Sequence, residues 1–144
     1  MDTVRQVLAR KGRAVWSVGP DAMVYEALQI MAEKDVGALL VMAGDRVVGM
    51  LSERDYARKV FLKGRSSPST PVREVMTERV HTVSPDRTIE ECMALMTIHR
   101  IRHLPVLEGD ALVGLISIGD VVKASLDEKD FLIKQLENYI TGSP

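Results

Sequence analysis

The chain is poor in cysteine, in aromatic residues and in any excess of charge of one sign. Its 144 residues include a single cysteine, which cannot form an intramolecular disulfide and is typical of a reducing compartment. The formal net charge of −1 lacks the basic excess of a nucleic-acid-binding domain. No apolar run approaches the roughly 18 residues of a membrane span, and the first residues lack the apolar segment of a secretory signal. We therefore predict a cytoplasmic protein that binds neither nucleic acid nor membrane.

The residues that are present suffice for a hydrophobic core. Apolar residues make up 46% of the chain, but aromatic residues only 4%, so the core is expected to be built from aliphatic side chains and methionine. A chain of this length forms one ordinary domain or two very small ones.

The chain repeats itself. When it is shifted by 65 residues, residues 15–55 align with residues 80–120 without a gap, and 14 of the 41 aligned positions are identical. Each copy ends on the same phrase of glycine, two apolar residues, serine, two variable residues and aspartate: GMLSERD at 49–55 and GLISIGD at 114–120. An ungapped internal repeat decides the architecture, because each copy is one structural unit.

Both copies predict the order β-α-β-β-α. Apolar residues at helical spacing indicate one helix face in each copy, and glycine-aspartate pairs between two short apolar runs predict β-hairpins. Thr88 and Glu91 have the spacing of a capping box at one helix start. The expected strands are 15–18, 38–42 and 46–52, then 80–83, 103–107 and 111–117; the expected helices are 24–31 and 55–63, then 89–96 and 120–128.

A unit of this size is too small to form a stable core alone. We therefore predict an α+β fold in which two β-α-β-β-α repeats, residues 4–65 and 72–128, pack sheet to sheet about a pseudo-two-fold axis. The stretch GRSSPSTP at 64–71 is expected to be the linker. Residues 129–144 form a tail whose amphipathic part, 130–140, predicts a final helix that caps the fold or mediates an interface; the alternative is a frayed tail.

These residues resemble a known family. The tandem units, the two Ser-x-x-Asp phrases, the element Thr82, Val83, Pro85, Asp86 and the strand Leu104–Val106 are similar to those of the CBS domain pair, or Bateman module, in its stand-alone form. The resemblance extends from about Val4 to Asp127. It implies a regulatory module that binds adenosine-containing ligands in clefts between the repeats.

The chemistry of the repeated phrase fits such a ligand. A carboxylate accepts hydrogen bonds from two adjacent ribose hydroxyls, and charged acceptors make the stronger bonds. A serine hydroxyl and the N–H groups of a helix start can bind ribose or phosphate oxygens, and the glycine allows close approach of backbone. The structural alternative is that Asp55 and Asp120 are only helix N-caps.

The resemblance implies two ligand sites of different character. The first carries two arginines, whose guanidinium groups suit phosphate oxygens, so we predict that it binds AMP, ADP or ATP; it comprises Ser52, Arg54, Asp55, Thr82, Ile101, Arg102 and His103. The second has no positive charge at the matched positions and is predicted to be empty or to take S-adenosylmethionine or part of NAD(H); it comprises Ser17, Val36, Gly37, Ala38, Ser117, Gly119 and Asp120.

Three functions compete. The leading hypothesis is a sensor of adenine nucleotides that signals to an unidentified partner protein by conformational change, as a flat homodimer formed by exposed apolar helices at 24–31 and 89–96. The alternative is a ligand-independent interaction module that modulates a partner enzyme such as a redox protein. An enzyme is disfavoured, because the chain has no P-loop, no Rossmann glycine pattern and no histidine spacing that suits a metal. We predict no catalytic residue and no metal site.

Overall fold

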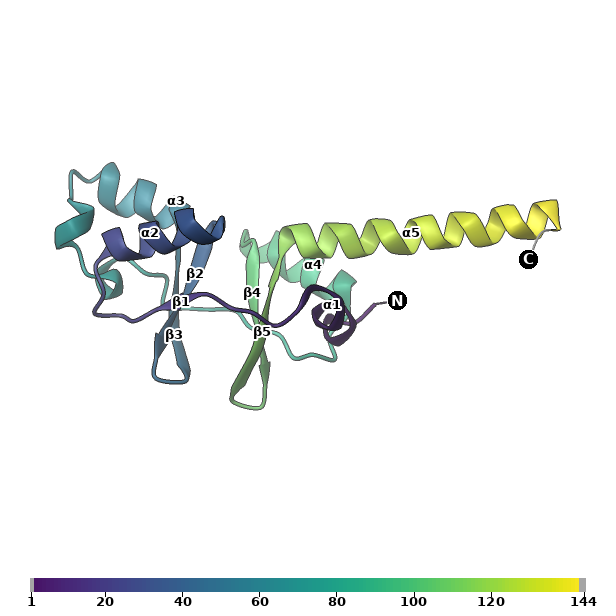
Figure 1. Cartoon of the computed structure of the whole chain (residues 1–144), viewed down its shortest axis with the longest axis horizontal. Helices are drawn as coiled ribbons and strands as arrows, with labels where there is room; N and C mark the ends of the chain where they lie inside the picture. The colour runs from purple at the N-terminus through teal and green to yellow at the C-terminus, as the bar shows by residue number, and fades with distance from the viewer. Residues whose placement is uncertain (1, 143–144) are drawn as a thin grey trace.

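The computed structural model describes residues 2–142 and shows two similar halves and one long projecting helix (Figure 1). The first half contains β1 (Ser17–Val18), α2 (Val24–Lys34), β2 (Ala38–Ala43), β3 (Arg46–Ser52), α3 (Glu53–Tyr56) and the π-helix η1 (Ala57–Phe61). The 3₁₀ turns η2 (Ser67–Ser69) and η3 (Val72–Glu74) follow. The second half contains α4 (Ile89–His99), β4 (His103–Glu108), β5 (Ala111–Ser117) and α5 (Ile118–Thr141), and α1 (Val4–Lys11) precedes the first half.

The two sheets repeat one topology, as the sequence repeat predicts. In the first, β2 lies between β1, which runs parallel to it, and the antiparallel β3. In the second, β4 pairs antiparallel with β5, and the predicted strand at 80–83 is reduced to one parallel bridge between Val83 and Val106. The sheets stand side by side, with β3 in contact with β5 (Figure 1). The predicted α+β fold of two packed repeats is confirmed.

The β-hairpins of the two halves are equivalent residue by residue. Gly44 and Gly109 begin the two turns with φ of 65° and 63°, a left-handed conformation that glycine adopts without strain. Each hairpin also has a register irregularity at the same point, after Val41 in the first and after Val106 in the second. The Ser-x-x-Asp phrases at the ends of β3 and β5 therefore lie at equivalent positions in the two halves.

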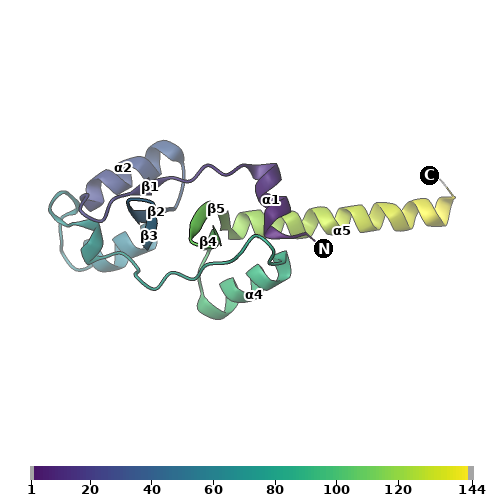
Figure 2. The ribbon, with the colours of Figure 1, turned by 90° about the horizontal axis from the view of Figure 1, so that it is seen from below.

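The hydrophobic core of each half includes residues that the sequence assigns to the other repeat. Val4, Val7 and Leu8 of α1 are buried in the core of the second half, and α1 lies beside that half in both views (Figures 1 and 2). Val72 and Val75, which follow the predicted linker, are buried in the core of the first half. The predicted bounds of 4–65 and 72–128 stay a prediction, but the packing crosses them in both directions.

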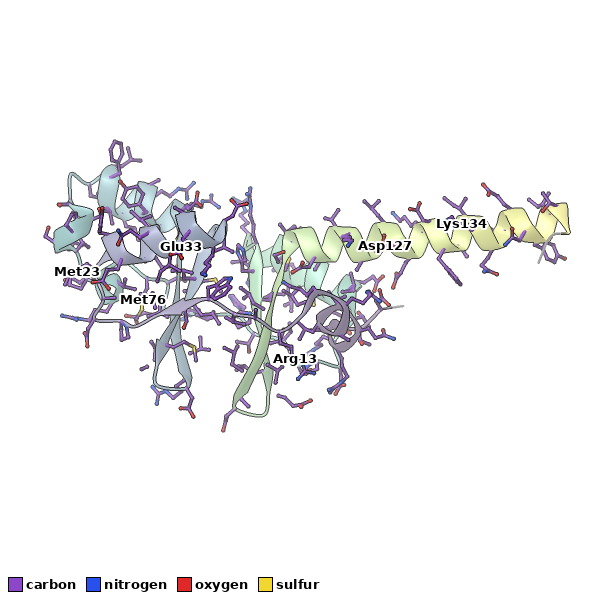
Figure 3. All side chains as sticks on the ribbon, in the orientation of Figure 1. Arg13, Met23, Glu33, Met76, Asp127 and Lys134 are labelled. Atoms are coloured by element: carbon purple, nitrogen blue, oxygen red, sulfur yellow. The ribbon has the colours of Figure 1, made fainter. Side chains whose placement is uncertain are left out.

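The glycine of each repeated phrase is needed for this crossed packing. A Cβ atom at Gly49 would lie 2.6 Å from the Met76 sulfur, and one at Gly114 would lie 2.7 Å from a methyl carbon of Leu8. Met76 is seen beside the first sheet in Figure 3. The close approach that the glycines permit is therefore to the protein's own side chains, whereas the sequence suggested an approach connected with a ligand.

Several predicted elements differ from the structure. In the helices at 24–31 and 89–96, Val24, Ala27 and Met31, like Ile89, Cys92 and Met96, face the two cores. Tyr25 stays 48% exposed, and the use of these helices in a homodimer stays a prediction. The helix predicted at 55–63 begins earlier, at Glu53, and becomes a π-helix. The linker at 64–71 is anchored: Thr70 is buried, and its carbonyl accepts a hydrogen bond from the Val24 N–H.

The helices predicted at 120–128 and 130–140 are one helix. Ser117 caps α5, which continues without a break for 24 residues. No glycine or proline interrupts residues 120–141, so nothing in the sequence ends the first predicted helix. The last half of α5 projects away from both sheets in both views (Figures 1 and 2).

Candidate functional site

A cavity of about 590 Å³ lies between the two halves. The first half contributes the end of β3 and the first residues of α3, and the second contributes the approach to its sheet and the turn from α4 to β4. The lining residues are Gly37, Met50, Ser52, Glu53, Arg54, Asp55, Thr77, Arg79, Val80, His81, Arg100, Ile101, Arg102 and His103. A molecule bound here would touch both repeats.

Ser52 and Asp55 form a capping box at the start of α3. The Asp55 N–H donates to the Ser52 hydroxyl over 3.1 Å, and the Ser52 N–H donates to Oδ2 of Asp55 over 3.0 Å. The N-cap is therefore the serine, and the aspartate is its partner one turn later, in contrast to the capping alternative considered from the sequence. Oδ1 of Asp55 is left to Thr77, 3.4 Å away, and to Lys59, 3.2 Å away. Asp55 lines the cavity, and a carboxylate oxygen can accept more than one hydrogen bond.

Four arginines line the cavity: Arg54, Arg79, Arg100 and Arg102. Within residues 2–142, none of them forms an ion pair, whereas most arginines elsewhere on the molecule do. Arg100 ends α4 in the left-handed conformation, with φ of 54°, which is unfavourable for a side chain of this size. Guanidinium groups left without carboxylate partners around one cavity favour an anionic ligand with several oxygens.

His103 lies at the start of β4, opposite Ser117, and lines the same cavity. Burial lowers the pKa of this imidazole, and the positive charge of Lys11 lowers it further; the carboxylate of Asp120 opposes the shift. The neutral form is thus favoured in the folded protein.

We expect this histidine to make stability fall as the pH is lowered. Its pKa is lower in the folded protein than in the unfolded chain, where it is about 6.5, so between the two values the unfolded chain binds more protons. The loss of stability is absent at pH values above the pKa of the unfolded chain, and it reaches its full size at pH values below the pKa of the folded protein. Urea unfolding of the wild type and of His103→Gln at pH 7.5 and pH 5.5 measures it. The wild type should lose more stability than the variant; equal losses would contradict the assignment.

The second predicted site has a different character from the first. Nζ of Lys11 lies 2.5 Å from Oδ2 of Asp120 and donates to the Leu115 carbonyl over 2.9 Å. Burial tends to raise the pKa of Asp120, but the hydrogen bonds from Lys11 and from the Ser117 N–H outweigh it and lower the pKa. The predicted residues of the second site carry no positive charge, but Lys11 of α1, which is not one of them, brings a positive charge to Asp120. Asp120 therefore has a cationic partner, as Asp55 has in Lys59, whereas within residues 2–142 the arginines of the first site have no anionic partner.

The structure brings most residues of the first predicted site together. Of its seven residues, only Thr82 does not line the cavity; Arg79, Val80 and His81, which precede it, line the cavity instead. Of the second predicted site, Gly37 lines this first cavity, Ala38 is buried in β2, and Gly119 borders a shallow groove on α5. Ser17 lies in β1, Val36 precedes β2, and Ser117 caps α5.

Sequence reasoning missed Arg79, Arg100 and His81. The run HRIRH at 99–103 carried a usable signal, because two further basic residues, His99 and Arg100, directly precede the three predicted positions 101–103. His81 also stacks on His99, with ring centroids 3.7 Å apart. This contact joins the segment before the second sheet to the end of α4. His81 and His99 are 18 positions apart, and neither the spacing of a strand nor that of a helix predicts a contact over this separation.

Other chemistries find little support in the described part of the chain. Residues 2–142 contain no group of three or more histidine, cysteine or acidic side chains that could hold a metal ion. Cys92 is buried in the second core, and burial raises the pKa of its thiol to about 11, which disfavours a nucleophilic thiolate. No helix among these residues is long and apolar enough to cross a membrane.

Comparison with known proteins assigns the family. The CBS domain model matches residues 4–61 and 72–127, which together cover most of the chain. The mitochondrial CBS domain-containing protein CBSX3 of Arabidopsis thaliana is 39% identical over 97% of this chain and 72% of its own length. The chain belongs to the CBS domain family. As a CBS domain pair it is a regulatory module.

Solved CBS domain pairs share its fold. A protein with CBS domains from Burkholderia ambifaria is 53% identical, with a TM-score of 0.86 over 88% of this chain and 95% of its own. The CBS domain pair of protein MJ0100, solved with 5′-methylthioadenosine and S-adenosyl-L-methionine, is 18% identical, with a TM-score of 0.79 over 89% of this chain and 98% of its own. The MJ0100 likeness shows the fold alone. Because CBSX3 is mitochondrial, the predicted cytoplasmic location stays a prediction.

Proposed function

We propose that this CBS domain pair senses an adenine nucleotide in the cavity between its repeats. The observation that carries the proposal is the set of four arginines without ion pairs, within residues 2–142, facing the same cavity as Asp55. The aspartate would accept bonds from the ribose hydroxyls, and the arginines would bind the phosphate oxygens. AMP, ADP and ATP are therefore the proposed ligands.

Signalling would follow from the position of the cavity. Its walls come from both repeats, so a bound nucleotide contacts residues of both and favours one angle between them. The change would be passed to a partner protein, and no residue is proposed to be catalytic. We also propose that the module acts as a homodimer.

Isothermal titration calorimetry with ATP, AMP and adenosine tests the ligand. We expect affinity to rise with the number of phosphates and to fall with salt, because phosphates supply most of the charge. Arg54→Gln with Arg102→Gln should weaken ATP binding at least about tenfold, roughly 1.4 kcal/mol, and leave adenosine binding nearly unchanged. The proposal fails if none of these ligands binds below millimolar concentration.

The second cleft and the interaction hypothesis need separate measurements. S-adenosylmethionine and NAD(H) stay proposed ligands of the second cleft. MJ0100, which shares the fold, was solved with 5′-methylthioadenosine and S-adenosyl-L-methionine. Asp120 is paired with Lys11 there, as Asp55 is with Lys59 in the first cleft, so it is the lack of arginines at the predicted positions that favours an empty second cleft. Affinity capture of partners with and without ATP separates the sensor from a ligand-independent module that binds, for example, a redox protein: capture unaffected by ATP favours the latter.

A further inference from the structure

The positive charge of the cavity is a property of this cleft and not of the fold. At the 65-residue spacing of the repeat, the positions equivalent to Arg54, Arg79, Arg100 and Arg102 carry no positive charge: they are Gly119, Ala14, Asp35 and Gly37, respectively. Asp35 has the same left-handed φ of 54° as Arg100, so the two helices end alike while the charge is reversed. The backbone of the repeat therefore does not require an arginine at this helix end.

The carboxylates of the cavity wall do not balance these arginines. Among residues 2–142, only two carboxylates line the cavity, those of Glu53 and Asp55. Two of the four arginine charges therefore have no counter-charge on the wall. His81 and His103 also line it and add no negative charge. A ligand that enters this cavity meets more positive than negative charge.

We propose that the cavity selects the magnesium-free form of its nucleotide. The inference rests on the nucleotide-sensing function proposed above and specifies which form of the ligand the sensor measures. Mg²⁺ binds oxygens of neighbouring phosphates and cancels part of their negative charge. Guanidinium groups bind the same oxygens, so the four arginines and the metal ion compete for them. The arginines also repel a cation that is already bound to the phosphates.

Asp55 is poorly placed to hold a metal ion. Its Oδ2 accepts a hydrogen bond from the Ser52 N–H over 3.0 Å, and its Oδ1 lies 3.2 Å from Nζ of Lys59. Mg²⁺ needs oxygen ligands at about 2.0–2.1 Å in near-octahedral geometry and usually keeps several waters. An ion on Oδ1 would lie beside the Lys59 ammonium group, and the Asp55 side chain, 14% exposed, leaves little room for those waters.

The other lining side chains do not complete a magnesium site. With Asp55 engaged, Glu53 is the one remaining carboxylate among the described residues that line the cavity. The imidazoles of His81 and His103 offer nitrogen, whereas Mg²⁺ prefers carboxylate, carbonyl and water oxygens. Residues 2–142 contain no group of three or more histidine, cysteine or acidic side chains that could hold a metal ion. The cavity therefore suits the phosphates better than it suits the ion that they carry.

Isothermal titration calorimetry with ATP, in EDTA and in excess Mg²⁺ at equal ionic strength, tests the selection. We expect the apparent affinity for ATP to fall at least about tenfold in Mg²⁺. AMP is the matched ligand, because a single phosphate cannot form the chelate that neighbouring phosphates form; its affinity should change less than about twofold. ATP binding that is equal or tighter in Mg²⁺ overturns this inference and leaves nucleotide sensing intact. Failure of both ATP and AMP to bind in EDTA contradicts the sensing function, and this inference with it.

The variant Arg79→Gln with Arg100→Gln tests whether the arginines bind the metal-free phosphates. We expect its affinity for ATP in EDTA to fall at least about tenfold, and its affinity for adenosine to stay within about twofold. Arg73→Gln is the control, because Arg73 pairs with Asp21 and does not line the cavity; it should bind ATP as the wild type does. Circular dichroism checks that the variants keep their fold. A double variant that binds ATP in EDTA with wild-type affinity overturns the proposal.

Discussion

Asp55→Ala should weaken ATP binding by about 30-fold to 1,000-fold, roughly 2–4 kcal/mol, if this carboxylate accepts bonds from the two ribose hydroxyls. Oδ1 of Asp55 is the oxygen that the capping box does not use; it lies 3.4 Å from the Thr77 hydroxyl and 3.2 Å from Nζ of Lys59. Adenosine should lose the same factor as ATP, since the lost contact involves the ribose and not the phosphates. Calorimetry with both ligands measures the effect.

Asp120→Ala is the matched control for that experiment. It removes the equivalent capping-box aspartate from the second repeat, at a similar cost to a helix start of about 1 kcal/mol, but Asp120 does not line the cavity. We expect its affinity for ATP to stay within a factor of three of the wild type. If Asp55→Ala binds ATP as the wild type does, or if both variants lose affinity equally, the ribose contact of Asp55 is wrong.

Leu8→Ala should lower the free energy of unfolding by about 2–5 kcal/mol, the range for a buried leucine whose removal leaves a cavity. Leu8 is 1% exposed, and its methyl groups fill the space above Gly114 in the core of the second repeat. Urea unfolding monitored by circular dichroism gives the value. Leu62→Ala is the control, because Leu62 is 72% exposed and its loss should cost less than about 0.5 kcal/mol.

The part of the protein that Leu8→Ala destabilises is as informative as the change in the free energy of unfolding. Leu8 lies near the start of the first repeat in sequence but packs in the core of the second half, so Leu8→Ala should first loosen α4, β4 and β5. Hydrogen exchange of the folded variant would show this as faster exchange in the second half than in the first. Faster exchange confined to residues 17–61 would contradict the crossed packing.

The local architecture was readable from the sequence because it depends on short-range patterns. Hairpin turns at Gly44 and Gly109, the capping box of Thr88 and Glu91, and the repeated order of elements all rest on residues a few positions apart. The exposure of a helix face was not readable in this way. Met31 and Met96 lie on apolar faces that a core and a dimer interface would use equally well, and only the packing shows that they face the cores.

The candidate site was partly predictable for the same reason. The resemblance to the family identified Arg54 and Asp55, which belong to the first repeated phrase, and Arg102, which directly precedes the facing strand β4. Arg79 and Arg100 were missed, because their place at the cavity depends on the path of a loop and on a left-handed helix end. Lys11 was missed because nothing in the repeat aligns with it; it reaches Asp120 only through the packing of α1.

The sequence by itself determined that the protein consists of two equivalent units, because a 65-residue repeat with turn and capping signals specifies each unit locally. Tertiary structure alone decided that Lys11 pairs with Asp120 and that α1 completes the second core. It also decided that the tail continues α5 as an exposed helix. These features arise from contacts between residues distant in sequence, which burial and charge pairing select and which no local pattern encodes.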